Sequence, residues 1–473
     1  MDEQIKVPKR VLASLIRSIS AGVVPRLGAP YIAIGRDEEI AALLNDLDAV
    51  ADGGSSMRFL IGKYGSGKSF LMQLLRGYAL ERGFLTADCD LSPERRICGG
   101  KGSGLATYRE LMRSLASKTS PEGSALPLIL SRWLSGLQAQ VAEEGFAPDG
   151  ASFGEEVSRR VYSLCRTLEN SVGGFDFATV LSRYYRAVLD GDEEGKSACL
   201  RFFCGEYTTK TEARRELGVG SIIDDDSWYE YIKLWAEFGT MLGYRGLVVF
   251  VDECVNLYKI TNRVSRENNY EKILSMFNDT LQGRAAHLGL ILGGTPQFLE
   301  DTRRGLFSYE ALRSRLADSR FGQGEYRDLV GPVIRLRRLS NNELYALLLR
   351  LTKLHGQYYG WEPRVSEEEK VAFLTESLRR AGADTLITPR EIIRDYMSLL
   401  NILCQNPTIT AEELLSKQRA QGTSTASAST GASPLGLGAV STAAATSTTA
   451  TSTAAAASPA PSRPTLTLTD IEL

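Results

Sequence analysis

A short glycine-rich stretch carries the clearest chemistry in the chain. From Gly62 to Ser69 it reads G-K-Y-G-S-G-K-S, which fits the Walker A spacing G-x-x-x-x-G-K-[ST]. Its glycines let the backbone curl until several N–H groups point at one anion. Lys68 can reach the β- and γ-phosphates of a nucleoside triphosphate, and the Ser69 hydroxyl can ligate Mg²⁺. The residues expected to contact the nucleotide here are Gly62, Gly65, Ser66, Gly67, Lys68, Ser69 and Phe70.

A second chemical pattern lies in "GLVVFVDECVNLYKI", where the apolar run Leu247–Val251 ends in Asp252 and Glu253. Two carboxylates at the end of a buried strand are unusual as packing, because unpaired buried charge is expensive. Beside a phosphate loop they have a use. Asp252 would hold Mg²⁺ through its water shell, and Glu253 would orient and activate the attacking water. The pattern is typical of a Walker B strand and predicts hydrolysis.

Two further positions could contribute to the same reaction. Thr295 ends the apolar run "LGLILGGTP", and its hydroxyl could contact the water or the γ-phosphate; an ordinary turn is the alternative. Downstream, "RRGLFSYEALRSRLAD" offers an arginine that could stabilise charge on a neighbouring subunit's γ-phosphate. Arg313 is the first choice and Arg315 the second, against the alternative of a solvated helix surface.

These residues need strands that end at one edge and a helix that starts at the loop. Phe59 to Ile61 predict the end of a buried strand, and the apolar positions after Ser69 recur at helical spacing. Further strands are predicted at 83–91, 247–251, 288–296 and 333–336. The predicted fold class is α/β, a P-loop NTPase with a parallel sheet flanked by helices.

A large helical insert, at about 105–241, and a small helical lid domain, 339–418, complete the prediction. The insert has no catalytic spacing, and its aromatic residues indicate helix packing, with a base-stacking platform as the alternative. In the lid, Thr388 should cap a helix that begins at Pro389. Arg390, in the first turn, could close onto the nucleotide; a surface ion pair is the alternative.

The two ends of the chain lie outside the predicted ATPase core, 31–338. Residues 1–30 should form a helix and a lead-in. Residues 419–463 are rich in Ala, Ser and Thr and predict a disordered linker, because they cannot bury enough surface to offset their ordering entropy. The final segment, 464–473, has spaced apolar residues and is interpreted as a docking peptide, with a frayed terminus as the alternative.

Composition narrows the class of protein. The chain has 473 residues, 43% of them apolar, which is enough for two or three packed domains. Its 55 Lys and Arg nearly balance 57 Asp and Glu, so any nucleic-acid-binding patch must be local. Seven scattered cysteines and two histidines argue against a disulfide framework or a zinc site. With no apolar run long enough for a membrane span, we expect a cytoplasmic protein without a membrane contact.

The order of these signals resembles AAA+ ATPases, nearest the origin-recognition and initiator-like clade. "GVVPRLGAPYIAIGRDEEI", "FLIGKYGSGKSFL", "VVFVDECVNLYK" and "YEALRSRL" look more narrowly like the BrxD-like ATP-binding proteins of bacteriophage-exclusion (BREX) clusters. The likeness spans about residues 8 to 405. Two departures are the long insert and the lack of a winged-helix sequence after the lid. The resemblance implies roles for Lys68 and Ser69 in Walker A, Asp252 and Glu253 in Walker B, Thr295 as sensor, Arg313 as arginine finger, Arg390 as lid sensor, and Gly35 and Arg36 beside the adenine.

The resulting expectation is a Mg²⁺-dependent ATPase that acts at a subunit interface of a homo-oligomer. The cofactors would be ATP and Mg²⁺, and no guanine-reading N-K-x-D motif is found where one is expected. Hydrolysis would remodel a partner protein or DNA, and the resemblance implies antiphage defence beside a helicase-like partner. Two alternatives stay open: a nucleotide-gated, STAND-like switch or scaffold with little turnover, and an initiator-like loader that binds duplex DNA.

Overall fold

The computed structural model describes residues 7–100, 102–148, 150–169, 171–318, 327–380 and 388–417. The predicted linker and docking peptide therefore lie outside the described residues. Contacts divide the chain into two compact units, of which the first ends at Leu339 and the second begins at Ser340 and also takes Ile19–Gly22. No helix in the described ranges is long and apolar enough to cross a lipid bilayer.

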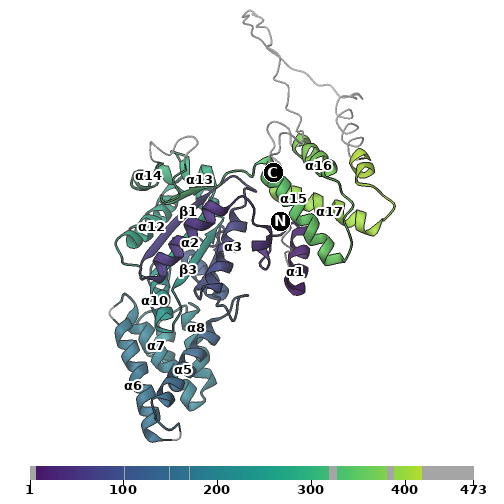
Figure 1. The fold of residues 1–473 in the computed structure, drawn as a ribbon. Helices are drawn as coiled ribbons and strands as arrows, with labels where there is room; N and C mark the ends of the chain where they lie inside the picture. The colour runs from purple at the N-terminus through teal and green to yellow at the C-terminus, as the bar shows by residue number, and fades with distance from the viewer. Residues whose placement is uncertain are drawn as a thin grey trace, which may run out of the picture. The chain divides into compact units, whose positions relative to one another are not determined.

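A five-stranded sheet is the centre of the first unit (Figure 1). Its strands are β1 (Ser55–Ile61), β2 (Leu85–Asp90), β3 (Leu247–Asp252), β4 (Leu288–Gly294) and β5 (Val333–Arg335). They lie in the order β2-β3-β4-β1-β5, and every neighbouring pair is parallel. The predicted α/β class with a parallel sheet is confirmed. All five carboxyl ends meet at one edge, where a parallel sheet places its binding site.

Both faces of the sheet are covered by helices. Leu60 packs with α2 (Asp37–Ala51) and α3 (Lys68–Glu81) on one face. Its neighbours in β1, Phe59 and Ile61, point to the other face and join a core with α10 (Trp228–Met241) and α12 (Arg263–Leu281). Because the end of β1 is buried from both sides, Phe59–Ile61 are apolar without alternation.

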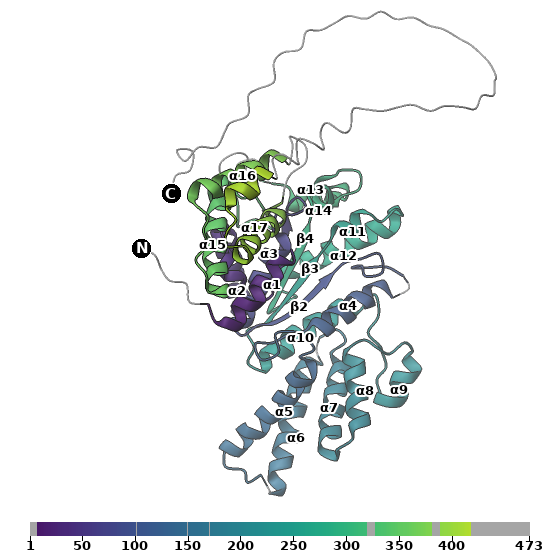
Figure 2. The ribbon, with the colours of Figure 1, turned by 90° about the vertical axis from the view of Figure 1, so that its right-hand side faces the viewer.

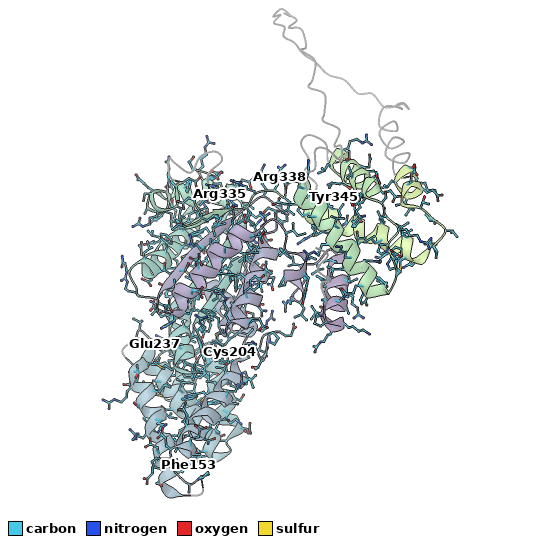
Figure 3. All side chains as sticks on the ribbon, viewed as in Figure 1. Phe153, Cys204, Glu237, Arg335, Arg338 and Tyr345 are labelled. Atoms are coloured by element: carbon cyan, nitrogen blue, oxygen red, sulfur yellow. The ribbon has the colours of Figure 1, made fainter. Side chains whose placement is uncertain are left out.

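Between β2 and β3 the described residues form helices and loops, with two isolated β-bridges. The helices are α4 (Ser103–Ser114), α5 (Leu126–Glu143), α6 (Ala151–Leu168), α7 (Gly174–Asp190), α8 (Glu193–Phe203), α9 (Lys210–Leu217) and α10. Helices α5 to α8 extend away from the sheet (Figure 2), with Phe153 at their far end (Figure 3). Phe177 is central to their core, with ring centroids 5.0 Å from both Phe203 and Trp235. The aromatic residues singled out in the sequence are buried, which confirms helix packing: Trp133, Tyr184, Tyr185, Phe202, Phe203, Trp228 and Tyr229.

Short elements complete the first unit. They are α1 (Lys9–Ser20), η1 (Ala29–Ile32), α11 (Val255–Tyr258), α13 (Pro296–Glu300), η2 (Leu306–Ser308) and α14 (Glu310–Leu316). α11 directly follows β3, and α13 directly follows β4, so each begins at the carboxyl edge of the sheet. All seven cysteines are free thiols.

The second unit contains α15 (Asn341–Tyr359), α16 (Glu367–Arg380) and α17 (Pro389–Gln405). Helix α15 starts with a capping box in which Ser340 and Glu343 satisfy each other's backbone N–H groups. Thr388 and Glu391 do the same for α17, with Pro389 at its first position. The predicted cap and start of this last helix are therefore confirmed.

Candidate active site

The glycine loop runs from the end of β1 to the first residue of α3. Gly65 and Gly67 have φ angles of 72° and 92°, in the left-handed region that favours glycine. A Cβ atom at Gly62 would lie 2.2 Å from the Ser66 hydroxyl oxygen, so this position also requires glycine. The Gly62 N–H donates to the Gly294 carbonyl at 3.1 Å, which joins the start of the loop to β4. The shape of the loop thus depends on all three glycines.

The Lys68 ammonium lies inside this loop. Its Nζ donates to the carbonyl oxygens of Gly62 and Lys63 at 3.0 and 3.1 Å. Burial lowers the pKa of Lys68, while the carboxylates of Asp252 and Glu253 oppose that shift. A cation held by neutral carbonyls in a glycine loop is well placed to receive an anion.

Ser69 connects the loop to the acidic end of β3. Its hydroxyl donates to Asp252 Oδ2 at 2.6 Å. Space for this carboxylate comes from Gly293 in β4, where an added Cβ would lie 2.4 Å from Asp252 Oδ1. Gly293 was missed in the sequence reasoning, although the glycine pair in "LILGGTP" marks a close approach of backbone or ligand.

The backbone turns sharply directly after Asp252. Glu253 has a φ angle of 55°, in the left-handed region that non-glycine residues rarely adopt. Its N–H donates to Asp252 Oδ1 at 2.8 Å, and the next N–H, of Cys254, donates to the Gly293 carbonyl at 3.0 Å. Such strained residues cost about 1–3 kcal/mol and cluster at functional sites. The strain here fixes the direction in which the Glu253 side chain leaves β3.

A third carboxylate lies at the same edge. Asp90 is the last residue of β2 and pairs in register with Asp252 of β3. Partial shielding from water raises the pKa of Asp90, and the carboxylates of Asp252 and Glu253 raise it further. Asp90 was also missed. Its signal was its place at the end of "LTADCD", but only the strand order shows which strand it faces.

Thr295 directly follows β4, the strand between β1 and β3. Its side chain is buried, and its hydroxyl oxygen accepts the Phe298 N–H at 3.3 Å, which caps α13. In this cap the Thr295 hydroxyl oxygen accepts a hydrogen bond, so its O–H group can still donate one to a ligand. The strand order thus brings Thr295 between the loop and the carboxylates.

The arginines expected to act on the nucleotide lie on α14 and α17. Arg313 and Arg315 are exposed on α14, where Arg315 donates to the Ala311 carbonyl of its own helix at 2.8 Å. Arg390 is exposed in the first turn of α17, in the second unit. Their proposed roles toward ATP stay predictions.

Gly35 and Arg36 precede α2. Gly35 has a φ angle of 69°, again in the left-handed region. Arg36 is buried, and its Nη2 donates to the carbonyl oxygens of Ser66 and Arg337 at 3.0 and 2.7 Å. The expected place beside adenine stays a prediction, but this side chain does contact the backbone of the glycine loop.

The residues present fit a Mg²⁺–nucleotide complex. In the described ranges no group of three or more His, Cys, Asp or Glu side chains could hold a metal alone. Mg²⁺ bound with phosphates needs only one or two protein ligands. Ser69 Oγ and Asp252 Oδ2 converge as such a pair. In addition, the Ser66 hydroxyl is buried in the loop without a hydrogen-bond partner, as expected where a ligand is missing.

Comparison with known proteins supports the same assignment. The family model described as the BREX system ATP-binding protein BrxC/D matches residues 7–419. The match includes the glycine loop, Asp252, Glu253 and the helices between β2 and β3, and it confirms the resemblance expected from the motifs. A comparison with curated proteins gives no match.

Proposed function

Because the chain belongs to the BREX system ATP-binding protein family BrxC/D, we propose that it is a Mg²⁺-dependent ATPase. One observation carries the proposal: the 2.6 Å hydrogen bond between Ser69 and Asp252, which joins the phosphate loop to the strand that also ends in Glu253. The glycine loop, the proposed metal ligands and the candidate base therefore lie at the same edge of the sheet. A protein that only held a nucleotide would need the loop, but would have no use for a strained glutamate beside it.

In the proposed binding step, the triphosphate enters the glycine loop. The loop N–H groups and the N-terminus of α3 bind its oxygens. Lys68 exchanges the carbonyls of Gly62 and Lys63 for phosphate oxygens, a stronger charge-assisted contact. Ser69 and Asp252 would hold Mg²⁺, which when bound neutralises charge on the β- and γ-phosphates.

In the proposed hydrolytic step, Glu253 accepts a proton from the attacking water and orients that water toward the γ-phosphate. The backbone at Glu253 is left-handed, and its N–H donates to Asp252 Oδ1, which supports different roles for the two acids. Thr295 lies between them and the loop and donates its O–H to the water or to a phosphate oxygen.

We further propose an AAA+ architecture for the working enzyme. The interposed strand β4, which brings Thr295 between the loop and Glu253, supports this class. Helices α15 to α17 would form a lid that offers Arg390, and a neighbouring subunit would offer Arg313 or Arg315 to the γ-phosphate. The exposure of these arginines suits a contact with another surface. The seven free thiols support a location in the cytoplasm, where thiols stay reduced.

In the cell, we propose that ATP turnover remodels a partner protein or DNA in BREX antiphage defence, beside a helicase-like partner. The family match to an ATP-binding BREX protein supports this role. A host that carries the other defence genes should lose phage resistance when Lys68 is changed to Ala in this gene. Unchanged plating of phage on that strain would count against the defence role.

Steady-state ATP hydrolysis tests the enzymatic part. Purified wild type, Lys68→Ala and Glu253→Gln are compared with and without duplex DNA. We expect turnover in the wild type that both changes remove, while Glu253→Gln still binds ATP. If the wild type binds ATP but never turns it over, with DNA and partner present, the protein is a nucleotide-gated switch. DNA binding that needs ATP and weakens steeply with salt would instead favour the initiator-like loader.

A further inference from the structure

Arg36 has a set of contacts that the proposed reaction does not explain. Its side chain is 5% exposed, and one nitrogen, Nη2, donates to two backbone carbonyls: Ser66 in the glycine loop and Arg337 after β5. The two N–H groups of Nη2 are thus divided between two segments that are distant in sequence. Nη1 lies 3.4 Å from Glu39 Oε1 in α2.

A second arginine uses the same carboxylate. Arg327 donates to Glu39 Oε1 at 2.7 Å and to the Arg335 carbonyl at 3.0 Å. Glu39 is only 2% exposed, so both guanidiniums are held by one buried charge. Removing one partner from such a buried cluster is costly, so these contacts are not easily broken. Figure 3 labels Arg335 and Arg338 on the segment that this cluster holds.

The contact with Ser66 has a consequence for the phosphate site. A peptide group is planar and trans, so the Ser66 carbonyl and the Gly67 N–H point in opposite directions. Gly67 has a φ angle of 92° and no Cβ, and this peptide would otherwise rotate easily. By holding the carbonyl on the protein side, Arg36 directs the Gly67 N–H to the opposite side, where the loop receives phosphate.

We propose that Arg36 is a positioning residue that orients the Ser66–Gly67 peptide for phosphate and couples the loop to residues 335–339. This segment leads along the chain into the second unit, which begins at Ser340. When a phosphate oxygen accepts a hydrogen bond from the Gly67 N–H, the Ser66 carbonyl tilts. Nη2 of Arg36, which contacts both carbonyls, transmits that tilt to the Arg337 carbonyl. The inference rests on the proposed binding of ATP in the loop.

The chain offers a closely matched control residue. Arg58 is 8% exposed, pairs with Asp46 of α2 at 2.7 Å, and donates to the carbonyls of Val330 and Gly331, which precede β5. It therefore combines the same elements as Arg36: a carboxylate on α2 and carbonyls beside β5. Its hydrogen bonds do not include the glycine loop.

The test compares Arg36→Lys with Arg58→Lys, because lysine keeps the charge but lacks the planar guanidinium, whose second terminal nitrogen in Arg36 lies beside Glu39. Two quantities are measured in each protein: the affinity for the non-hydrolysable analogue AMP-PNP with Mg²⁺, and hydrogen exchange of residues 335–339 with and without it. In wild type we expect AMP-PNP to slow exchange there. Arg36→Lys should weaken binding about tenfold, as for one charge-assisted hydrogen bond, and remove the change in exchange. Arg58→Lys should alter neither.

Kinetics add a readout that general destabilisation would not give. A residue that prepares the loop for the ground-state phosphate should raise KM for ATP and leave kcat nearly unchanged in Arg36→Lys, as loss of uniform binding does. The inference is wrong if Arg36→Lys matches wild type in affinity and exchange, if Arg58→Lys shows the same losses, or if wild type binds AMP-PNP without any change at 335–339. Failure of the proposed function is distinct, since wild type would then not bind AMP-PNP or hydrolyse ATP.

Discussion

Replacing Gly293 with alanine should disable catalysis while leaving ATP binding nearly intact. The new Cβ would lie 2.4 Å from Asp252 Oδ1, whereas ordinary contacts begin near 3.4 Å. The carboxylate must therefore move away by about 1 Å, because position 293 belongs to β4, whose main chain is held in the sheet and cannot move aside as a flexible side chain would. Met72 on the other side is 3.1 Å from the same Cβ and adds to the crowding.

The size of the effect follows from what the Asp252 carboxylate holds. Oδ2 accepts the Ser69 hydroxyl at 2.6 Å and Oδ1 accepts the Glu253 N–H at 2.8 Å. A shift of about 1 Å lengthens both bonds and displaces the proposed metal ligand and the proposed base together. Misplacement of this size costs on the order of 100-fold in rate. The phosphate contacts of the loop are not touched, so ATP affinity should change by less than about threefold.

The assay is steady-state ATP hydrolysis as a function of Mg²⁺, with ATP binding measured in parallel. Gly289→Ala is the control, because Gly289 lies in the same buried strand but its added Cβ would meet Val248 at an ordinary 3.5 Å. We expect Gly289→Ala to retain wild-type kcat. Wild-type kcat and Mg²⁺ dependence in Gly293→Ala would refute the assignment of Asp252 as the metal-holding carboxylate.

Two further predictions concern stability. Trp361 donates to His355 Nδ1 at 2.9 Å, so this buried ring is neutral, and burial lowers its pKa. As pH falls, the unfolded chain binds the proton before the folded one does, so the free energy of unfolding should fall below about pH 6.5 and level off below the folded pKa. Urea melts of wild type and His355→Gln at several pH values measure this. Equal slopes of unfolding free energy against pH in the two proteins would contradict it. Phe177→Ala should lower the free energy of unfolding of the insert by about 3–5 kcal/mol, measured by denaturation, and leave ATP affinity unchanged.

Local patterns in the sequence were enough to predict the loop, the acidic strand end and the parallel sheet. The glycine spacing, the apolar run before Asp252 and the cap at Thr388 each depend on residues a few positions apart. Such patterns can be recognised in the sequence, because the glycines of a phosphate loop and the cap of a helix are set by neighbouring residues.

The missed parts of the site depend on strand order. Asp90 is 162 positions before Asp252, and only the pairing of β2 with β3 makes them neighbours. Gly293 matters because β4 lies beside β3. Arg36 was predicted as a site residue, but its contacts with Ser66 and Arg337 were not. No spacing rule in a single sequence reports these contacts, since the long insert separates the strands that meet. The left-handed backbone at Glu253 likewise arises from its hydrogen bonds rather than from its residue type.

The most direct test of the central claim is the fate of nucleotide in a single turnover. Excess purified protein is mixed with a limiting amount of ATP and Mg²⁺, and the nucleotide is separated after quenching. Wild type should convert the bound ATP to ADP, and Glu253→Gln should bind ATP equally well yet release it uncleaved. Conversion by Glu253→Gln at the wild-type rate would show that the carboxylate after β3 is not the base, and would contradict the account of the site.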